Sequence, residues 1–273
     1  MMRMDAFADE RDFALLARDR YTFSVLDRIL RGPCELILTD HESLILCHSE
    51  RPYPVWIWTG DGCPDAVKES AWRLINAHRP FSEGYRINLK YELAEYFIQR
   101  AGEAGMRLGY AQRLFAYDCP DPIAPDEQTD GGLHVCTPAD AAEAAGLIAR
   151  FSADIGEAAP DPARCLEKAR AYIDAGTFFF WKNGRGETAA CCSYKINQGL
   201  ACVGSVYTLP EERRKHYARH LVYQVTERVK KMGLTPMLYT DAEYPASNAC
   251  YQKIGYALRG KLCTLAALRS GQR

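Results

Sequence analysis

Residues 206–218 read VYTLPEERRKHYA, and this stretch decides how the rest of the chain is interpreted. An apolar strand leads into a turn marked by Pro210, and a long amphipathic helix follows. Such a turn leaves backbone N–H groups without partners at the helix N-terminus, where the positive end of the helix dipole lies. That arrangement favours binding of an anion, above all a phosphate. The consecutive cations at positions 213–215 strengthen this interpretation, although an ordinary turn with a solvated basic patch has the same composition.

A second motif follows the helix. Residues 236–241 read as an apolar strand, and residues 247–256, SNACYQKIGY, begin with a short helix. In this order the two motifs resemble the GNAT superfamily of acyl-CoA-dependent N-acyltransferases. Its hallmark is a strand, then Arg/Gln-x-x-Gly-x-Gly/Ala, then a helix, with Asn-x-x-Tyr and a Gly-Phe/Tyr pair further on. Here RRKHYA and NACY occupy these places, and the resemblance covers residues 133–268.

The resemblance implies a fold, a cosubstrate and a set of site residues. The fold is α/β (α+β), with the GNAT acyl-CoA N-acyltransferase fold in the C-terminal domain, and the cosubstrate is acetyl-CoA. In the family, the cosubstrate lies like an additional strand where two strands separate. The residues implied to contact CoA are Val206, Tyr207 and Thr208 on the strand, Arg213, Arg214, Lys215, His216, Tyr217, Ala218 and Arg219 at the turn, and Asn248 on the short helix.

One position departs from the family pattern, because His216 stands where the family has its first glycine. Glycine at such a turn provides either close backbone approach or a positive φ angle. We expect the backbone at His216 to be helical already, so that a side chain is allowed there and either tolerates the phosphates or donates a hydrogen bond to them. The alternative is a decayed site that binds CoA poorly.

Tyr251 is the candidate general acid. A phenol with a pKa of about 10 is protonated at neutral pH and can donate to a leaving thiolate whose pKa is about 8.5. The alternative is a core tyrosine on a short helix. Asn248, one helical turn earlier, can hold either the pantetheine arm or the start of the helix. No carboxylate lies in residues 200–207, so Asp241 and Glu243 are the nearest candidates for a general base.

Composition excludes several functional classes. The 273 residues carry a net charge of −1, with 48% hydrophobic and 25% charged residues, as in ordinary soluble proteins. Basic residues are spread out apart from the turn, which argues against nucleic-acid binding. No apolar run is long enough to cross a bilayer, and the first ten residues are too polar for a signal peptide. We therefore expect a cytoplasmic protein without nucleic-acid or membrane partners; a homo-oligomer is compatible with this composition.

The cysteines point to a reducing compartment. There are eleven, an odd number, and no Cys-x-x-Cys pair occurs among them. Several stand in apolar, strand-like contexts, which is typical of small core residues rather than of a disulfide framework. Cys47 with His48, and His134 with Cys136, are alternative metal ligands, but no second pair lies at the spacing of a zinc finger. We therefore expect no metal site.

Residues 119–132 predict a domain boundary, because three prolines, four acids and two glycines in fourteen residues oppose regular structure. The expected organisation is an N-terminal domain (1–118), a linker (119–132) and a C-terminal domain (133–273). Hydrophobic periodicity and caps predict the order βααβββαβαβ after the linker. Residues 34–117 predict βββαβαβ, the order of the second half, which indicates a degenerate GNAT-like domain. Its turn at residues 59–65 carries acids where phosphates need cations, so we expect no CoA there.

These observations favour an N-acetyltransferase that transfers an acetyl group from acetyl-CoA to a primary amine of a small molecule or a peptide. The alternative is a non-catalytic acyl-CoA-binding or interaction module.

Overall fold

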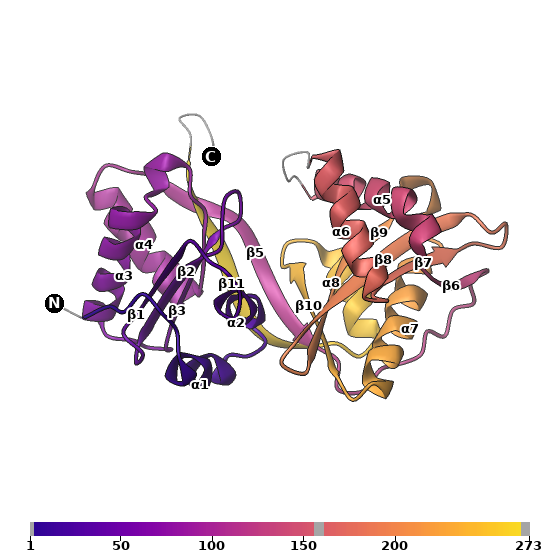
Figure 1. Cartoon of the computed structure of the whole chain (residues 1–273), viewed down its shortest axis with the longest axis horizontal. Helices are drawn as coiled ribbons and strands as arrows, with labels where there is room; N and C mark the ends of the chain where they lie inside the picture. Colours follow the sequence, from indigo (N-terminus) through magenta and orange to yellow (C-terminus); the bar gives the residue numbers. More distant parts are fainter. Residues whose placement is uncertain (1–2, 156–160, 269–273) are drawn as a thin grey trace. The chain divides into compact units, whose positions relative to one another are not determined.

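The computed structural model describes residues 3–155 and 161–268, and its contacts divide the chain into two compact units (Figure 1). The first unit comprises residues up to Ala116, Thr240–Glu243 and the residues from Arg259 on. The second unit comprises Tyr117–Tyr239 and Tyr244–Leu258. None of the described helices is long and apolar enough to cross a membrane.

The first unit confirms the order βββαβαβ predicted for residues 34–117 and adds two N-terminal helices that the sequence analysis did not propose. The first of these begins at a capping box, in which the Asp9 side chain accepts from the backbone of the first turn and the Asp12 side chain accepts from the backbone of Asp9. The elements are α1 (Glu10–Arg18), α2 (Ser24–Leu30), β1 (Leu36–Thr39), β2 (Leu44–His48), β3 (Val55–Thr59), α3 (Asp65–His78), the 3-10 turn η1 (Phe81–Glu83), β4 (Ile87–Leu89), α4 (Tyr91–Glu103) and β5 (Leu108–Asp118).

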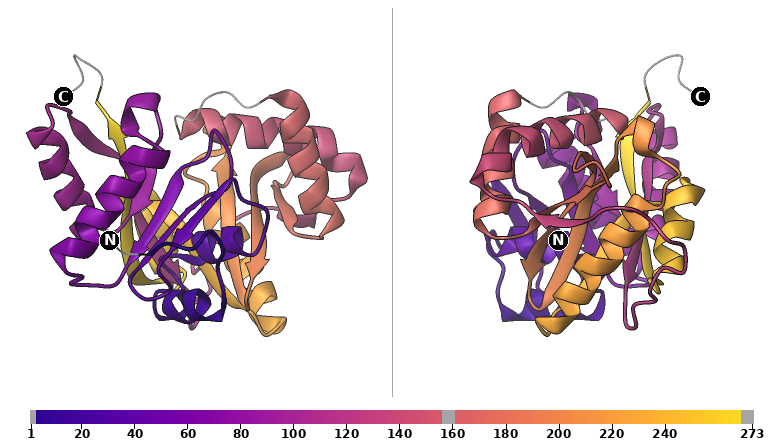
Figure 2. Two further views of the ribbon diagram at one scale, coloured as in Figure 1. Left: turned by 60° about the vertical axis from the view of Figure 1, so that its left-hand side comes forward. Right: turned by 90° about the vertical axis from the view of Figure 1, so that its right-hand side faces the viewer.

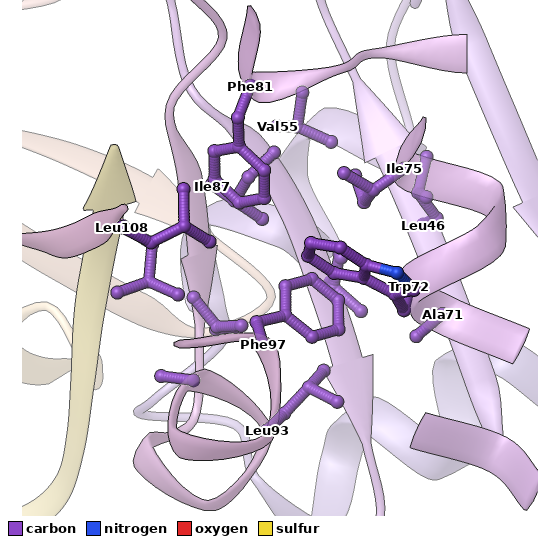
Figure 3. Close-up of a cluster of buried hydrophobic side chains, with 14 of the residues drawn as sticks. Leu46, Val55, Ala71, Trp72, Ile75, Phe81, Ile87, Leu93, Phe97 and Leu108 are labelled. Atoms are coloured by element: carbon purple, nitrogen blue, oxygen red, sulfur yellow. The ribbon is translucent and has the colours of Figure 1, made fainter. Parts of the chain in front are cut away.

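Both faces of the first unit's sheet are covered, which explains the continuous apolar runs of β2 and β3. On one face Trp72 of α3 and Phe97 of α4 meet with ring centroids 5.3 Å apart, and Phe81 packs against both (Figure 3). On the other face Phe23, next to α2, contacts Trp56 of β3 at 6.2 Å. The N-terminal helices are therefore needed to bury the second face of the sheet.

The elements from residue 132 on confirm the predicted order βααβββαβαβ. Thr137 and Asp140 form a capping box, and Gly233, with φ of 75°, follows the end of the long helix. The elements are β6 (Gly132–Val135), the 3-10 turn η2 (Pro138–Asp140), α5 (Ala141–Asp154), α6 (Pro162–Asp174), β7 (Phe178–Lys182), β8 (Thr188–Asn197), β9 (Leu200–Thr208), the 3-10 turn η3 (Pro210–Glu212), α7 (Tyr217–Lys231), β10 (Thr235–Asp241), α8 (Pro245–Lys253) and β11 (Ala257–Ala267).

Strands β6 to β9 form an antiparallel series, and β10 joins β9 in parallel. Side chains of β7 alternate between the two faces of this sheet. Phe178 and Phe180 pack with α5 and α6, whereas Trp181 lies beside residues of α7, with its ring centroid 6.4 Å from that of Tyr217. Figure 2 shows α5 and α6 grouped on one side of these strands and α7 on the other.

The contact units differ from the expected domains in two places. Residues 119–132 belong to the second unit, and β11 from Arg259 on belongs to the first. Although β11 follows α8 along the chain, Cys263 pairs with Leu89 of β4. The backbone N–H of Cys119, directly after β5, donates to Pro236 O of β10. Periodicity predicts that a strand exists but not which strand it pairs with, so the sequence did not predict the neighbours of β11 and of the end of β5.

Candidate functional site

Strand β9 carries a distortion near its centre. Ser205 has φ of 50°, and the ladder between β8 and β9 shifts in register between Cys191 and Ser193. The parallel ladder with β10 joins Thr235–Leu238 to Leu200–Val203. Among the described residues, β9 beyond Val203 has no ladder partner in β10. Backbone groups on that side of the strand are therefore available to hydrogen-bond an extended ligand.

The three strand residues implied to contact CoA lie in this part of β9, which pairs with β8 on one edge and has no ladder partner in β10 on the other. Val206 and Thr208 are half-buried, whereas Tyr207 is buried in the cluster under α5 and α6. Tyr207 pairs with Cys191 of β8, so one edge of β9 is held by the sheet. The strand therefore supplies backbone groups on its other edge, and the Tyr207 side chain serves the core.

The turn between β9 and α7 uses two residues with left-handed backbone. The chain is extended at Arg213, and then Arg214 has φ of 67° and His216 has φ of 65°. The expectation that the backbone at His216 is already helical is therefore wrong, because this residue is the N-cap, outside the helix. A positive φ explains why glycine suits this position. No side chain of the described residues caps α7, so N–H groups of its first turn remain open to an anion.

Replacing His216 by glycine is expected to raise the free energy of unfolding by about 0.5–1 kcal/mol. The left-handed backbone costs a residue with a Cβ about 1–2 kcal/mol, and glycine removes this strain. Glycine also has more freedom in the unfolded chain, which reduces the gain by about 0.5–1 kcal/mol. Urea denaturation measures this change. The matched control is His216→Ala, which removes the imidazole but keeps the Cβ and should not be stabilised. A glycine variant no more stable than the alanine variant would contradict a strained turn.

Two cations of the turn are held by neighbouring carboxylates. Arg213 Nη2 lies 3.1 Å from Asp154 Oδ2 at the end of α5, and its Nε donates to Thr208 O at 3.2 Å. Lys215 Nζ donates to Glu212 Oε2 at 2.8 Å. Arg213 thus joins the end of β9 to α5. Both charges are largely compensated within the chain.

A third cation, Arg219, is buried and faces residues 126–130, which we name the acidic strap. Its guanidinium pairs with Asp126 and Glu127 of the strap. Tyr217, also buried, donates its hydroxyl to Asp130 Oδ1 at 2.5 Å. Burial and then the Asp130 carboxylate raise the pKa of Tyr217 to about 12. The expected linker is therefore irregular, as predicted, but it packs closely against the start of α7.

Arg214 is the cation that the turn leaves unpaired. Within residues 3–155 and 161–268, its side chain has no ion pair or hydrogen bond, and it is exposed. His216 is exposed as well, and Ala218 is half-buried in the first turn of α7. Among the residues implied to contact the phosphates, Arg214 is therefore the guanidinium that can reach an anion without first losing a carboxylate partner.

Helix α8 places Asn248 and Tyr251 on one buried face. Asn248 Nδ2 donates to Tyr244 O at 2.9 Å, and its Oδ1 accepts from the Tyr117 hydroxyl at 3.2 Å. Both ends of this amide are therefore used inside the protein, in agreement with the alternative that Asn248 holds the start of the helix. By fixing α8, the amide also fixes the position of Tyr251.

The Tyr251 ring is buried and meets Tyr256 edge-on, with centroids 5.9 Å apart. Burial raises the pKa of Tyr251 well above its usual range, so the phenol stays protonated at neutral pH. The described residues offer its hydroxyl no hydrogen-bond acceptor, whereas the Tyr256 hydroxyl is 2.7 Å from that of Thr226. The protonated hydroxyl without an internal acceptor fits a general acid, and the buried ring packed on Tyr256 fits the alternative of a core tyrosine.

The candidate bases Asp241 and Glu243 belong to the first unit. Glu243 forms an ion pair with Arg113, and its backbone N–H donates to Asp241 Oδ1 at 2.8 Å. Both carboxylates are therefore engaged, and neither is a free base in this arrangement.

In the first unit, the turn between β3 and α3 corresponds to the turn before α7. Its groups are hydrogen-bonded to other residues of the chain. The Gly62 N–H donates to Glu92 Oε2 at 2.9 Å, and Lys90 Nζ donates to Asp61 Oδ1 at 2.6 Å. A carboxylate thus occupies the place where a phosphate would need N–H donors, which supports the prediction that this turn does not bind CoA.

The two histidines considered as metal ligands have other partners. His48 Nδ1 accepts from Arg79 Nε at 3.0 Å, and His134 Nε2 lies 3.0 Å from Asp140 Oδ2. Among the residues that the structure describes, one other group, Asp9, Asp12 and His41 in the first unit, has ligand atoms within 4.8 Å of one another. In that group His41 Nδ1 is 2.7 Å from Asp12 Oδ2, so the side chains are already satisfied as a structural network.

Comparison with known proteins identifies the family of one stretch of the chain. Residues 148–256 match the model of the acetyltransferase (GNAT) family. This stretch is a GNAT acetyltransferase domain. The match contains the bulged strand β9, the turn with Arg214 and the helix with Tyr251, and the fold class expected from the sequence is confirmed.

Solved structures similar to the chain have the same fold. A GCN5-related N-acetyltransferase from Sphaerobacter thermophilus has a TM-score of 0.70 at 14% identity, covering 98% of this chain and 97% of its own. One from Kribbella flavida has a TM-score of 0.62 at 17% identity, covering 92% and 95%. A GNAT-family acetyltransferase from Colwellia psychrerythraea has a TM-score of 0.60 at 11% identity, covering 98% and 100%. No curated protein matches the chain significantly.

Sequence reasoning missed the residues that shape the GNAT domain's turn from a distance. Asp154 and the acidic strap lie far from the turn along the chain, yet they hold Arg213 and Arg219. The four acids of residues 119–132 were a visible signal, because a run of acids can neutralise a basic turn. Their partners were not visible, since ion pairs between distant segments depend on the fold.

Proposed function

We propose that the GNAT domain transfers an acetyl group from acetyl-CoA to a primary amine of a small molecule or a peptide, in the cytoplasm. The observation that carries this proposal is the uncapped start of α7, which follows β9 after the turn at residues 209–216 and stands next to the exposed Arg214. The last part of β9 has no partner in β10 among the described residues. Backbone donors with one cation suit a pyrophosphate, and an open strand edge suits the pantetheine arm.

The chemistry requires the amine nitrogen to attack the thioester carbonyl carbon, so that a C–N bond forms and the C–S bond breaks. In our proposal the Tyr251 hydroxyl donates its proton to the departing thiolate, and solvent then restores that proton. Backbone N–H groups of β9 polarise the carbonyl. The amine releases its proton to water or enters already neutral, because Asp241 and Glu243 are engaged elsewhere.

A second candidate function is a non-catalytic acyl-CoA-binding or interaction module. Two observations favour it: the strained His216 at the turn, and the absence of any carboxylate from β9. The acetyltransferase and the acyl-CoA-binding form of this module both require CoA at the turn and differ in turnover, whereas an interaction module does not require CoA.

The Arg214→Ala variant is expected to bind CoA about 10- to 100-fold more weakly, because a hydrogen bond to a charged group contributes about 1.5–3 kcal/mol. Affinity for pantetheine without phosphates should be nearly unchanged. Calorimetry of the whole chain at fixed salt measures both affinities.

The control for this variant is Arg170→Ala, which removes an exposed arginine from α6. It tests whether loss of one positive charge anywhere weakens CoA binding. Equal CoA affinity in the Arg214→Ala variant and the unchanged protein would remove the turn from the site.

A further inference from the structure

We propose that the acidic strap is a positioning element for the phosphate-binding turn, and that Thr129 is its positioning residue. This inference rests on the proposed function, since it concerns how the turn is prepared for CoA. Thr129 Oγ1 donates to Lys215 O at 3.0 Å. Lys215 stands between the two left-handed residues, Arg214 and His216, so this bond acts on the part of the turn with the least common backbone.

The hydrogen bond fixes the direction of a backbone donor. Lys215 O and the N–H of His216 belong to one planar trans peptide unit and point in opposite directions. When Thr129 holds the carbonyl toward the strap, the N–H of His216 must point away from it. A rotation of this peptide would turn the carbonyl oxygen, a partial negative charge, toward a phosphate. The hydroxyl of Thr129 therefore selects the orientation that suits an anion.

The strap is itself anchored to the second unit. Asp130 Oδ2 accepts from the Gly184 N–H at 2.7 Å, and Asp130 O accepts from Trp181 Nε1 at 3.0 Å. Near the start of the strap, Glu127 O lies 2.9 Å from His220 Nε2 on α7. Because both ends of the strap are fixed to the sheet and to α7, Thr129 acts from a rigid support. Such preorganisation lowers the conformational cost of binding.

The three carboxylates of the strap all have partners within the second unit. Asp126 and Glu127 face Arg219, and Asp130 accepts from the Tyr217 hydroxyl and from the backbone of Gly184. Arg219 compensates only one of these charges, so a net negative charge remains on the strap, and the exposed Arg214 is the cation of the turn that can offset it toward an anion.

The test is a set of threonine variants in the whole chain. Thr129→Val keeps the shape of the side chain and removes the hydroxyl; Thr129→Ser keeps the hydroxyl. Thr188→Val is the matched control, since the Thr188 hydroxyl is buried without a partner among the described residues. We expect Thr129→Val to weaken CoA binding and to raise KM for acetyl-CoA about three- to tenfold, the loss of one hydrogen bond, with kcat unchanged. Thr129→Ser and Thr188→Val should match the unchanged protein.

A second variant tests the anchoring of the strap, and melting curves exclude a folding defect. Tyr217→Phe removes the strap's bond at Asp130 and should raise KM in the same way, at a temperature where melting curves show each variant folded. Unchanged affinity in Thr129→Val, a loss of equal size in Thr188→Val, or a fall in kcat at constant KM would overturn the inference. If the unchanged protein binds no CoA, the proposed function itself fails, whereas CoA binding that ignores Thr129 overturns the strap's role alone.

Discussion

The Tyr251→Phe variant is expected to lose about 10²- to 10⁴-fold in kcat, the usual contribution of a general acid, while its affinity for CoA stays unchanged. The ring still packs against Tyr256, and the hydroxyl leaves behind no internal partner, so the fold should be unaffected. Burial raises the pKa of Tyr251, so the acid stays protonated as the pH rises through neutrality and beyond 10, its usual pKa. Thiol release from acetyl-CoA with an accepted amine measures the rate.

Two comparisons show whether this loss belongs to the leaving thiolate. An acyl donor with a more acidic thiol needs less protonation, so it should recover part of the rate of the Tyr251→Phe variant. Tyr194→Phe is the matched control, because Tyr194 is also buried and, within the described part of the chain, its hydroxyl donates to the Met232 sulfur at 3.7 Å and to no other group. A Tyr251→Phe variant that turns over at the unchanged rate would make Tyr251 a packing residue.

A fragment of residues 133–273, the C-terminal domain expected from the sequence, should show no cooperative unfolding transition. It lacks β5, whose end lies beside β10, and it lacks β4, with which β11 pairs. It also lacks the acidic strap, which leaves the buried guanidinium of Arg219 without its carboxylates. Removing one partner of a buried ion pair is strongly destabilising. Circular dichroism during heating measures the transition.

A longer fragment, residues 104–273, is the comparison for this prediction. It keeps β5 and the strap but still lacks β4, so it should be better folded than residues 133–273 and less stable than the whole chain. A cooperative unfolding transition of the shorter fragment, at a midpoint near that of the whole chain, would contradict the need for β4 and β5 in its fold.

The order of elements could be predicted because each signal is local. Thr137 and Asp140 are three residues apart and form the capping box, and Gly233 ends α7 where its positive φ is needed. The apolar stripe of α7 and the motifs around Arg214 and Tyr251 likewise lie within short windows. Such patterns depend on neighbours in the sequence, which is why they are visible without a structure.

The remaining features depend on contacts between distant residues. Arg213 looked like a phosphate ligand, but Asp154, 59 residues away, pairs with it. The left-handed backbone at His216 arises from how the chain enters α7, and histidine gives no signal for it. Helices α1 and α2 were missed because their role, covering the second face of β2 and β3, becomes visible only when the sheet is assembled.

The central claim is that the turn before α7 and Tyr251 serve one reaction, acetyl transfer from acetyl-CoA to an amine. Its most direct measurement follows free thiol release from acetyl-CoA by the whole chain against a panel of primary amines, alongside calorimetry with CoA. We predict that CoA binds, and that at least one amine accelerates thiol release in proportion to the concentration of the protein, with an N-acetylated product identified by mass. Binding of CoA without amine-dependent release on any member of the panel would contradict the claim and favour the non-catalytic module.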